Sequence, residues 1–159
     1  MKKIVFLDLE GTVIDDFEKV GFASLINIVP VRNFIAAEAP MAVRLFSFAL
    51  WSEHCLNQFS RFFESRLNKA LHREIDLVDT FTTDKLFMLC RRHGYVFDDA
   101  RECRLFHGKD YGFERFIEMS PQYDDTEVIL VDDAVESKRI QYPGRNTAIR
   151  MVNVNDLLN

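Results

Sequence analysis

The sequence lacks the features that mark several classes of protein. Its three cysteines are far apart and form no C-x-x-C pair, so neither a zinc site nor a disulfide framework is indicated. No apolar run approaches the length of a membrane span. Asp8 and Glu10 also interrupt the first apolar run too early for a signal peptide. We therefore expect a soluble, cytoplasmic protein with reduced thiols, no membrane segment and no internal repeats.

An excess of positive charge is also missing. The 159 residues carry 25 acidic and 20 basic side chains, and the resulting net charge of −5 is unfavourable for a broad nucleic-acid-binding surface. Apolar residues are plentiful instead: 48% of the chain is hydrophobic and 15 residues are Phe, which predicts an aromatic-rich core. Length and composition together predict a single folded domain over residues 1–159.

Short apolar runs alternate with amphipathic segments along the whole chain. The runs that predict strands are residues 4–7, 42–51, 75–81, 105–106, 128–131 and 147–152. The segments that predict helices are residues 30–40, 52–70, 84–93, 110–119 and the end of a helix at 138–142, with an irregular flap at 13–29. This alternation predicts an α/β fold with a Rossmann-like parallel sheet and helices on both faces.

Carboxylates follow two of the predicted strands. Asp8 and Glu10 come directly after the first strand, with Thr12 two residues later, and Asp132 and Asp133 follow the strand at 128–131. Ligands of parallel sheets bind beyond the carboxyl ends of the strands. Right-handed crossovers bring those ends to one edge, so we expect these acidic side chains to meet there.

Such a set of residues suits phosphoryl transfer from a monoester. Asp8 can attack phosphorus, and Glu10 can protonate the leaving group and later activate water. Asp132 and Asp133 form with Asp8 a cluster of hard oxygen ligands that suits Mg²⁺. Since these carboxylates would repel one another without a cation, the electrostatics predict metal dependence.

The order of these residues resembles the four motifs of the haloacid dehalogenase (HAD) superfamily. The residues that resemble motifs I to IV are, in order, Asp8-Leu9-Glu10-Gly11-Thr12, Ser47 (Ser52 is less favoured), Lys109 and Asp132-Asp133. The resemblance covers essentially the whole chain. It implies a Mg²⁺-dependent phosphomonoester hydrolase that forms an aspartyl-phosphate.

The resemblance also implies a role for each motif residue. Asp8 would be the nucleophile and Glu10 the general acid and base. The remaining roles are phosphate binding by Thr12, Ser47 and Lys109, and Mg²⁺ binding by Asp8, Asp132, Asp133 and the Glu10 carbonyl. Most phosphatases of the superfamily have Asp in the place of Glu10, whereas its enolase-phosphatases have Asp-x-Glu-Gly-Thr. The longer side chain leaves the specificity for the leaving group open.

Two other interpretations stay open. The DEDD-type 3′–5′ exonucleases also begin with Asp-x-Glu, and residues 107–113 resemble their middle motif loosely and at the wrong spacing. A HAD-like domain that binds a partner or a phosphorylated ligand without catalysis is the second alternative.

The intervals between the motifs predict how the site is covered. The segments after Thr12 and between Ser47 and Lys109 are too short for a full cap domain. We therefore expect little or no cap and an open site. Such a site suits a large phosphorylated substrate, such as a polynucleotide end, a glycan or a protein, or it requires a second subunit as a lid. Nucleic acid is expected only as a substrate.

Overall fold

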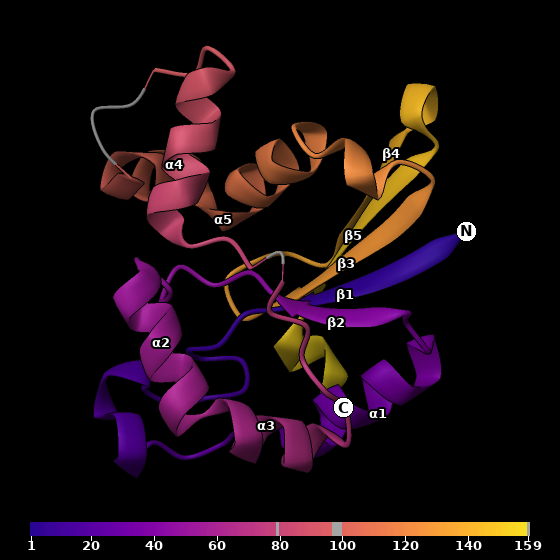
Figure 1. Cartoon of the computed structure of the whole chain (residues 1–159). Helices are drawn as coiled ribbons and strands as arrows, with labels where there is room; N and C mark the ends of the chain where they lie inside the picture. The colour runs from indigo at the N-terminus through magenta and orange to yellow at the C-terminus, as the bar shows by residue number, and fades with distance from the viewer. Residues whose placement is uncertain (79, 97–99, 159) are drawn as a thin grey trace.

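The computed structural model describes residues 1–78, 80–96 and 100–158, with the side chains of residues 100–107 left out (Figure 1). Its centre is a five-stranded sheet in the order β2-β1-β3-β5-β4. The strands are β1 (Lys2–Leu7), β2 (Ala42–Leu45), β3 (Thr126–Asp132), β4 (Lys138–Tyr142) and β5 (Thr147–Asn153). All neighbours pair in parallel except β4, which lies antiparallel to β5 at the edge.

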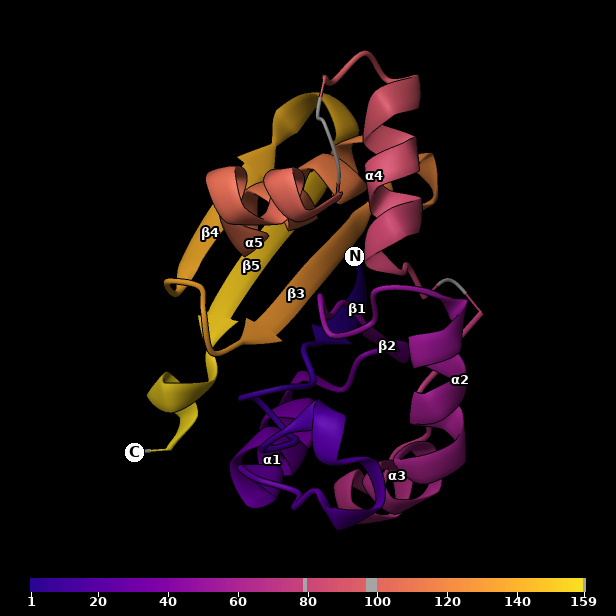
Figure 2. The ribbon, with the colours of Figure 1, turned by 90° about the vertical axis from the view of Figure 1, so that its left-hand side faces the viewer.

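Helices cover both faces of the sheet (Figure 2). The helices are α1 (Ile28–Glu38), α2 (Glu53–Phe62), α3 (Glu64–Leu71), α4 (Thr83–Arg92) and α5 (Ala100–Glu118), with 3₁₀ turns η1 (Phe17–Phe22), η2 (Pro121–Tyr123), η3 (Pro143–Arg145) and η4 (Val154–Leu157). The first three helices pack on one face, and α4 and α5 pack on the other. The predicted α/β, Rossmann-like architecture is confirmed at this level.

Alternation along β1 divides the core into two layers. Val5 and Leu7 face the layer of α1, α2 and α3, whereas Ile4 and Phe6 face α4 and α5, as the period of two in a strand requires. Phe6 meets the ring of Phe113 edge-on, with the ring centroids 5.3 Å apart. Such a pair adds about 0.5–1.5 kcal/mol to the free energy from burial. The aromatic-rich core predicted from the Phe content is present.

The register of the sheet brings three strand ends to one level. Leu7 pairs with Leu45 of β2 and with Val131 of β3. The residues that follow these positions therefore emerge side by side at the carboxyl edge. This relationship places Asp8, Asp132 and the loop after β2 next to one another, as the positions of the strands in the sequence predict.

Several predicted elements are wrong. Residues 138–142, expected as the end of a helix, form β4. Only Ile140 and Tyr142 of this edge strand are apolar and partly buried, and two such positions do not distinguish a strand from the end of a helix. Residues 105–106, expected as a strand, belong to α5, since so short an apolar run is equally compatible with a helix. Helix α5 also begins ten residues before the expected start, with a non-helical Gly108 inside it (φ 74°, ψ 170°).

Other boundaries differ from the prediction. The strand expected at 42–51 ends at Leu45, and the helix expected at 52–70 is broken at Phe63 into α2 and α3. The described part of 75–81, which excludes Asp79, forms no strand. It runs beside β2, where the Asp76 amide donates a hydrogen bond to the Val43 carbonyl at 2.8 Å. An edge segment with so little pairing is not distinguished from a strand by its alternation alone.

Two further predictions concern cysteines and membranes. Cys55 and Cys90 are free thiols, and the side chain of Cys103 lies outside the described residues. Within the described ranges, no helix has both the length and the apolar character that crossing a membrane requires.

Candidate functional site

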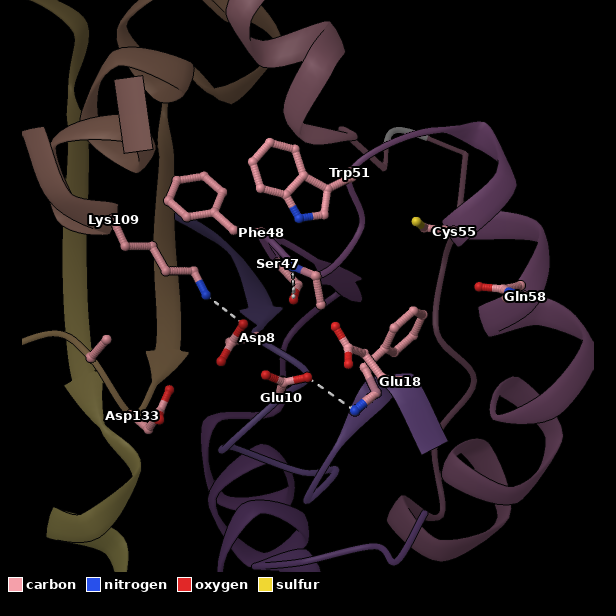
Figure 3. Close-up of a pocket in the computed structure, with 13 residues that line it drawn as sticks. Asp8, Glu10, Glu18, Ser47, Phe48, Trp51, Cys55, Gln58, Lys109 and Asp133 are labelled. Carbon is pink, nitrogen blue, oxygen red and sulfur yellow. Dashed lines mark hydrogen bonds and ion pairs between the residues drawn. The ribbon is translucent and has the colours of Figure 1, made fainter. Parts of the chain in front are cut away.

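A pocket of about 730 Å³ opens at the carboxyl edge of the sheet (Figure 3). Its walls come from the segment after β1, the loop and helix after β2, helix α5 and the loop after β3. This volume falls within the range of small-molecule sites. The pocket brings together five of the residues predicted from the sequence: Asp8, Glu10, Ser47, Lys109 and Asp133.

Asp8 lies at the base of the pocket with both carboxylate oxygens engaged. The residue is only 3% exposed, and its backbone N–H donates to the Val131 carbonyl at 3.0 Å. Thr12 Oγ1 donates a hydrogen bond to Asp8 Oδ2 at 2.9 Å, and Lys109 Nζ forms an ion pair with Oδ1. Thr12 is itself fully buried. The structure thus places Thr12 against Asp8 and not on the pocket wall, where a phosphate-binding role was expected.

A tight turn after Asp8 fixes the rest of the first motif. The Leu9 carbonyl accepts hydrogen bonds from three successive amides, those of Thr12, Val13 and Ile14. Gly11 within this turn has φ +81°, a conformation that side chains other than hydrogen rarely adopt. A Cβ at Gly11 would also lie 2.3 Å from Asp133 Oδ2. The glycine therefore lets the acidic end of β3 approach the turn.

Lys109 reaches the same place from α5. It follows the kink at Gly108, and its Nζ pairs with Asp8 and lies 2.6 Å from Asp132 Oδ2. Burial favours the neutral amine, but the charges of Asp8 and Asp132 outweigh this effect and raise the pKa of Lys109 above its usual value. Lys109 is therefore a firmly protonated, buried cation at the centre of the site.

Asp132 and Asp133 supply the second acidic element. Asp132, fully buried at the end of β3, accepts a hydrogen bond from the Ala134 amide at 2.7 Å. Burial raises the pKa of Asp132 to about 6, although Lys109 opposes the shift. Partial desolvation and the nearby charge of Asp8 likewise raise the pKa of the exposed Asp133. Desolvation is the main cause of both shifts, and three carboxyl groups face the single charge of Lys109 here.

These three aspartates fit a divalent cation. One carboxylate oxygen from each of Asp8, Asp132 and Asp133 lies within 4.8 Å of the others. Oxygen-only donor sets of this kind suit Mg²⁺, which is held in proteins by one or two carboxylates together with water and phosphate oxygens. The unbalanced charge and the donor chemistry therefore suit the predicted metal. The side chain of Glu10 does not belong to this cluster.

Glu10 lines the pocket without belonging to the aspartate cluster. Its carboxylate is exposed and lines the cavity, and Oε2 accepts a hydrogen bond from the Phe17 amide at 3.0 Å. Phe17 begins η1, which belongs to the segment expected as an irregular flap. The flap thus positions the carboxyl group that was predicted as the general acid and base.

The two serine candidates have different surroundings. Ser47 lines the pocket, is 3% exposed, and accepts a hydrogen bond from the Ala49 amide at 3.3 Å. Ser52 precedes α2, where its hydroxyl contacts Cys55 Sγ at 3.8 Å, and it does not line the pocket. The structure therefore places Ser47, and not Ser52, at the pocket.

Sequence reasoning missed most of the outer wall of the pocket. The residues concerned are Phe17, Glu18, Phe48, Ala49, Trp51, Cys55, Gln58 and Ala134. None of them belongs to a motif with a fixed spacing. The strand predicted at 42–51 hid Phe48 and Trp51, because they lie on a loop beside Ser47. Loops are where binding residues are common.

We also compared the chain with known proteins. No family model, no curated protein and no solved structure matches it. A function therefore has to be inferred from the geometry of the pocket and from the resemblance of its motifs.

Proposed function

We propose that this protein is a Mg²⁺-dependent phosphomonoester hydrolase of the HAD type, with little or no cap domain. The supporting observation is that Lys109, which lines the pocket, contacts both Asp8 and Asp132. These residues come from three motifs that lie far apart in the sequence. Phosphoryl transfer requires at least a nucleophile, a cation and a metal-binding carboxylate in one place.

In the first half of the reaction, an Asp8 oxygen attacks phosphorus while the bond from phosphorus to the leaving oxygen breaks. Thr12 and Lys109 hold the carboxylate in a single orientation, which reduces the entropic barrier to attack. Glu10 gives a proton to the leaving oxygen. Lys109 and the Ser47 hydroxyl stabilise the charge on the transferred group.

In the second half, Glu10 takes a proton from a water molecule that attacks the aspartyl-phosphate. The bond between Asp8 and phosphorus breaks, inorganic phosphate leaves, and both carboxyl groups return to their starting states. Mg²⁺ held by Asp8, Asp132 and Asp133 would neutralise charge on the phosphate. The hydrogen bond from the Phe17 amide keeps Glu10 on the wall of the pocket in both halves.

The walls of the pocket take the place of a cap. Helix α2 contributes Cys55 and Gln58, and η1 contributes Phe17 and Glu18. Together they leave a cavity the size of a small-molecule site. This shape favours a small phosphorylated substrate over the large substrates that an open site would admit.

Hydrolysis of p-nitrophenyl phosphate provides the test. We expect release of p-nitrophenol with Mg²⁺, none with EDTA, and none with Asp8→Asn. Asp125→Asn is the matched control, because Asp125 lies before β3 at the other end of the sheet and has φ +55°, which Asn tolerates well. Absence of Mg²⁺-dependent release by the folded wild-type protein would contradict the proposal.

The exonuclease alternative gains no support from the described residues. The side chain of His107, in the segment that loosely resembles an exonuclease motif, lies outside them. Degradation of single-stranded DNA in the absence of phosphatase activity would reinstate that alternative. Absence of both the phosphatase and the exonuclease activity would favour the non-catalytic binding domain.

A further inference from the structure

Aromatic rings line one side of the pocket. Phe48 and Trp51 lie on the loop between β2 and α2, and Figure 3 shows their rings next to each other beside Ser47. The ring of Phe48 packs against the ring of Phe46, with the centroids 5.9 Å apart. Lys109 Nζ lies 5.4 Å from the centroid of the Phe48 ring. One flank of the place where a phosphate would bind is therefore a wall of aromatic side chains.

The core accounts for these rings only in part, since Phe48 packs against it and yet both rings also line the pocket. Phe46, on the same loop, is 2% exposed and packs on Phe113 and Phe116, so it is a core residue. Phe48 and Trp51 are only partly buried and contribute to the pocket surface. Aromatic rings that face a cavity offer a stacking surface to any flat ring, whatever its substituents.

Carboxylates occupy the part of the pocket formed by residues 10–18. Glu10 and Glu18 line this part, and Asp8 and Asp133 line the pocket elsewhere. Lys109 is the one basic side chain among the described residues that line the pocket, and it already pairs with two aspartates. A phosphoryl group at Asp8 would use this lysine and the metal ion. A second anionic group on the substrate would then face Glu10 and Glu18, with no further cation among the described lining residues to receive it.

Gln58 completes the environment. Its side chain extends from α2 into the pocket from the side opposite Lys109 (Figure 3). A primary amide both donates and accepts hydrogen bonds, so it suits the neutral polar edge of a heterocycle. The wall thus combines stacking surface, an uncharged polar group and negative charge.

We infer that the pocket takes a phosphomonoester with one phosphate, whose leaving group carries a flat aromatic ring and no other anionic group. A nucleoside monophosphate has this chemistry. The ring lies against Phe48 and Trp51, and Glu18 excludes substrates with a second phosphate. This inference rests on the proposed function for its catalytic part, but the binding of the ring does not depend on catalysis.

Three probes test the selectivity. We expect kcat/KM for uridine 5′-monophosphate to exceed that for ribose 5-phosphate about tenfold or more, as stacking on aromatic side chains supports. We expect uridine 3′,5′-bisphosphate to be poorer than the monophosphate about tenfold or more. Trp51→Leu should bring the ratio of monophosphate to ribose 5-phosphate to about threefold or less. Phe34→Leu, on α1 away from the pocket, should leave the ratio unchanged.

Fluorescence separates the inference from the proposed function. Trp51 is the single tryptophan of the chain, so its emission reports a ring bound beside it. Uridine, which cannot be hydrolysed as a phosphomonoester, should quench the wild-type emission in a saturable way, whereas ribose should not. Saturable quenching without any phosphatase activity would overturn the proposed function and retain the aromatic-ring site. Equal hydrolysis of uridine 5′-monophosphate and ribose 5-phosphate, without quenching by uridine, would overturn the inference and retain the phosphatase.

Discussion

The backbone amide of Phe17 donates a hydrogen bond of 3.0 Å to the side chain of Glu10. The two residues are seven positions apart, and the contact joins the strand end that carries the acidic motif to the 3₁₀ segment over the pocket. Without it, an exposed glutamate would sample many rotamers. The flap therefore restricts the position of the Glu10 carboxylate, and the longer side chain at this position acquires a defined place.

Glu10→Gln should separate the two halves of the reaction. The p-nitrophenolate leaving group needs no proton, so phosphorylation of Asp8 should still occur, whereas loss of the base should slow hydrolysis of the aspartyl-phosphate. We expect a burst of about one equivalent of p-nitrophenol, followed by turnover lowered about 10²- to 10⁴-fold. Rapid mixing measures the burst. Glu136→Gln, an exposed site outside the pocket, should behave like the wild type; slow turnover without a burst would argue against the two roles.

Ser47→Ala and Ser52→Ala should have unequal effects. Ser47 lines the pocket and Ser52 does not, so only the first variant loses a hydrogen bond to phosphate. Hydrogen bonds to charged groups contribute about 1.5–3 kcal/mol, which predicts a fall in kcat/KM of tenfold or more for Ser47→Ala alone. Steady-state kinetics with p-nitrophenyl phosphate measure both variants. A larger loss for Ser52→Ala would reverse the assignment.

Lys109→Met should destabilise the metal-free protein. The substitution leaves the buried carboxylates of Asp8 and Asp132 without their cation, and breaking a buried pair in this way costs about 3–5 kcal/mol. Urea unfolding with EDTA measures the loss, and Mg²⁺ should restore part of it. Lys138→Met is the control: Lys138 pairs with Asp110 at the surface, so its loss should cost less than about 1 kcal/mol.

Gly11→Ala should disturb the acidic cluster through sterics alone. The added Cβ would meet Asp133 Oδ2 at 2.3 Å, at a φ of +81°. We expect a loss of at least about 1 kcal/mol in the free energy of unfolding and a higher Mg²⁺ concentration for half-maximal activity. Gly144→Ala, where the same calculated Cβ meets nothing within 4 Å, should change neither quantity. An unaltered Mg²⁺ requirement would show that Asp133 moves aside without consequence for the metal.

The buried Asp132 should give the metal-free protein a distinctive pH dependence. Burial raises its pKa from 3.8 to about 6, so the folded state holds this proton more tightly than the unfolded state. Its stabilising contribution is therefore complete below about pH 4 and disappears as the pH rises through about 6. The shift corresponds to about 3 kcal/mol at most, since one pKa unit is about 1.4 kcal/mol.

Other carboxyl groups, such as Glu38 and Asp110, have a lowered pKa, so they make the free energy of unfolding rise with pH. They do so equally in the wild type and in Asp132→Asn, and comparison of these two proteins therefore isolates the effect of Asp132. In EDTA, the wild type should lose stability relative to the variant between about pH 4 and 7. Urea unfolding at several pH values measures the difference. A constant difference over this range would exclude protonation of Asp132 in the folded state.

The sequence predicted the inner half of the site and not its outer half. Asp8 and Asp132 were predictable because each directly follows a run of four apolar residues, and the parallel register of β1 and β3 brings the ends of these runs together. Lys109 was predictable only through the resemblance of the motifs. Its position also depends on the kink at Gly108, which the helical pattern of residues 110–119 does not reveal.

Phe48 and Trp51 show why the outer half was missed. The run from Ala42 to Trp51 is almost wholly apolar, so it has no period that distinguishes a buried strand from an aromatic loop. The strand ends at Leu45 because of its tertiary surroundings: the chain leaves the sheet there to enter the pocket wall. The antiparallel β4 was missed for the opposite reason, since only Ile140 and Tyr142 of this short strand are apolar and partly buried.

The loop and helix that follow β2 carry a further consequence. They supply Phe48, Trp51 and Gln58, whereas β1, β3 and α5 supply Asp8, Asp132 and Lys109. Most of the parts that would recognise a substrate are thus covalently continuous with one another and separate from most of the parts that would react with it. A library confined to the pocket-lining side chains of residues 48–58, with the core residue Leu50 retained, would therefore search for new substrates on an unchanged catalytic base.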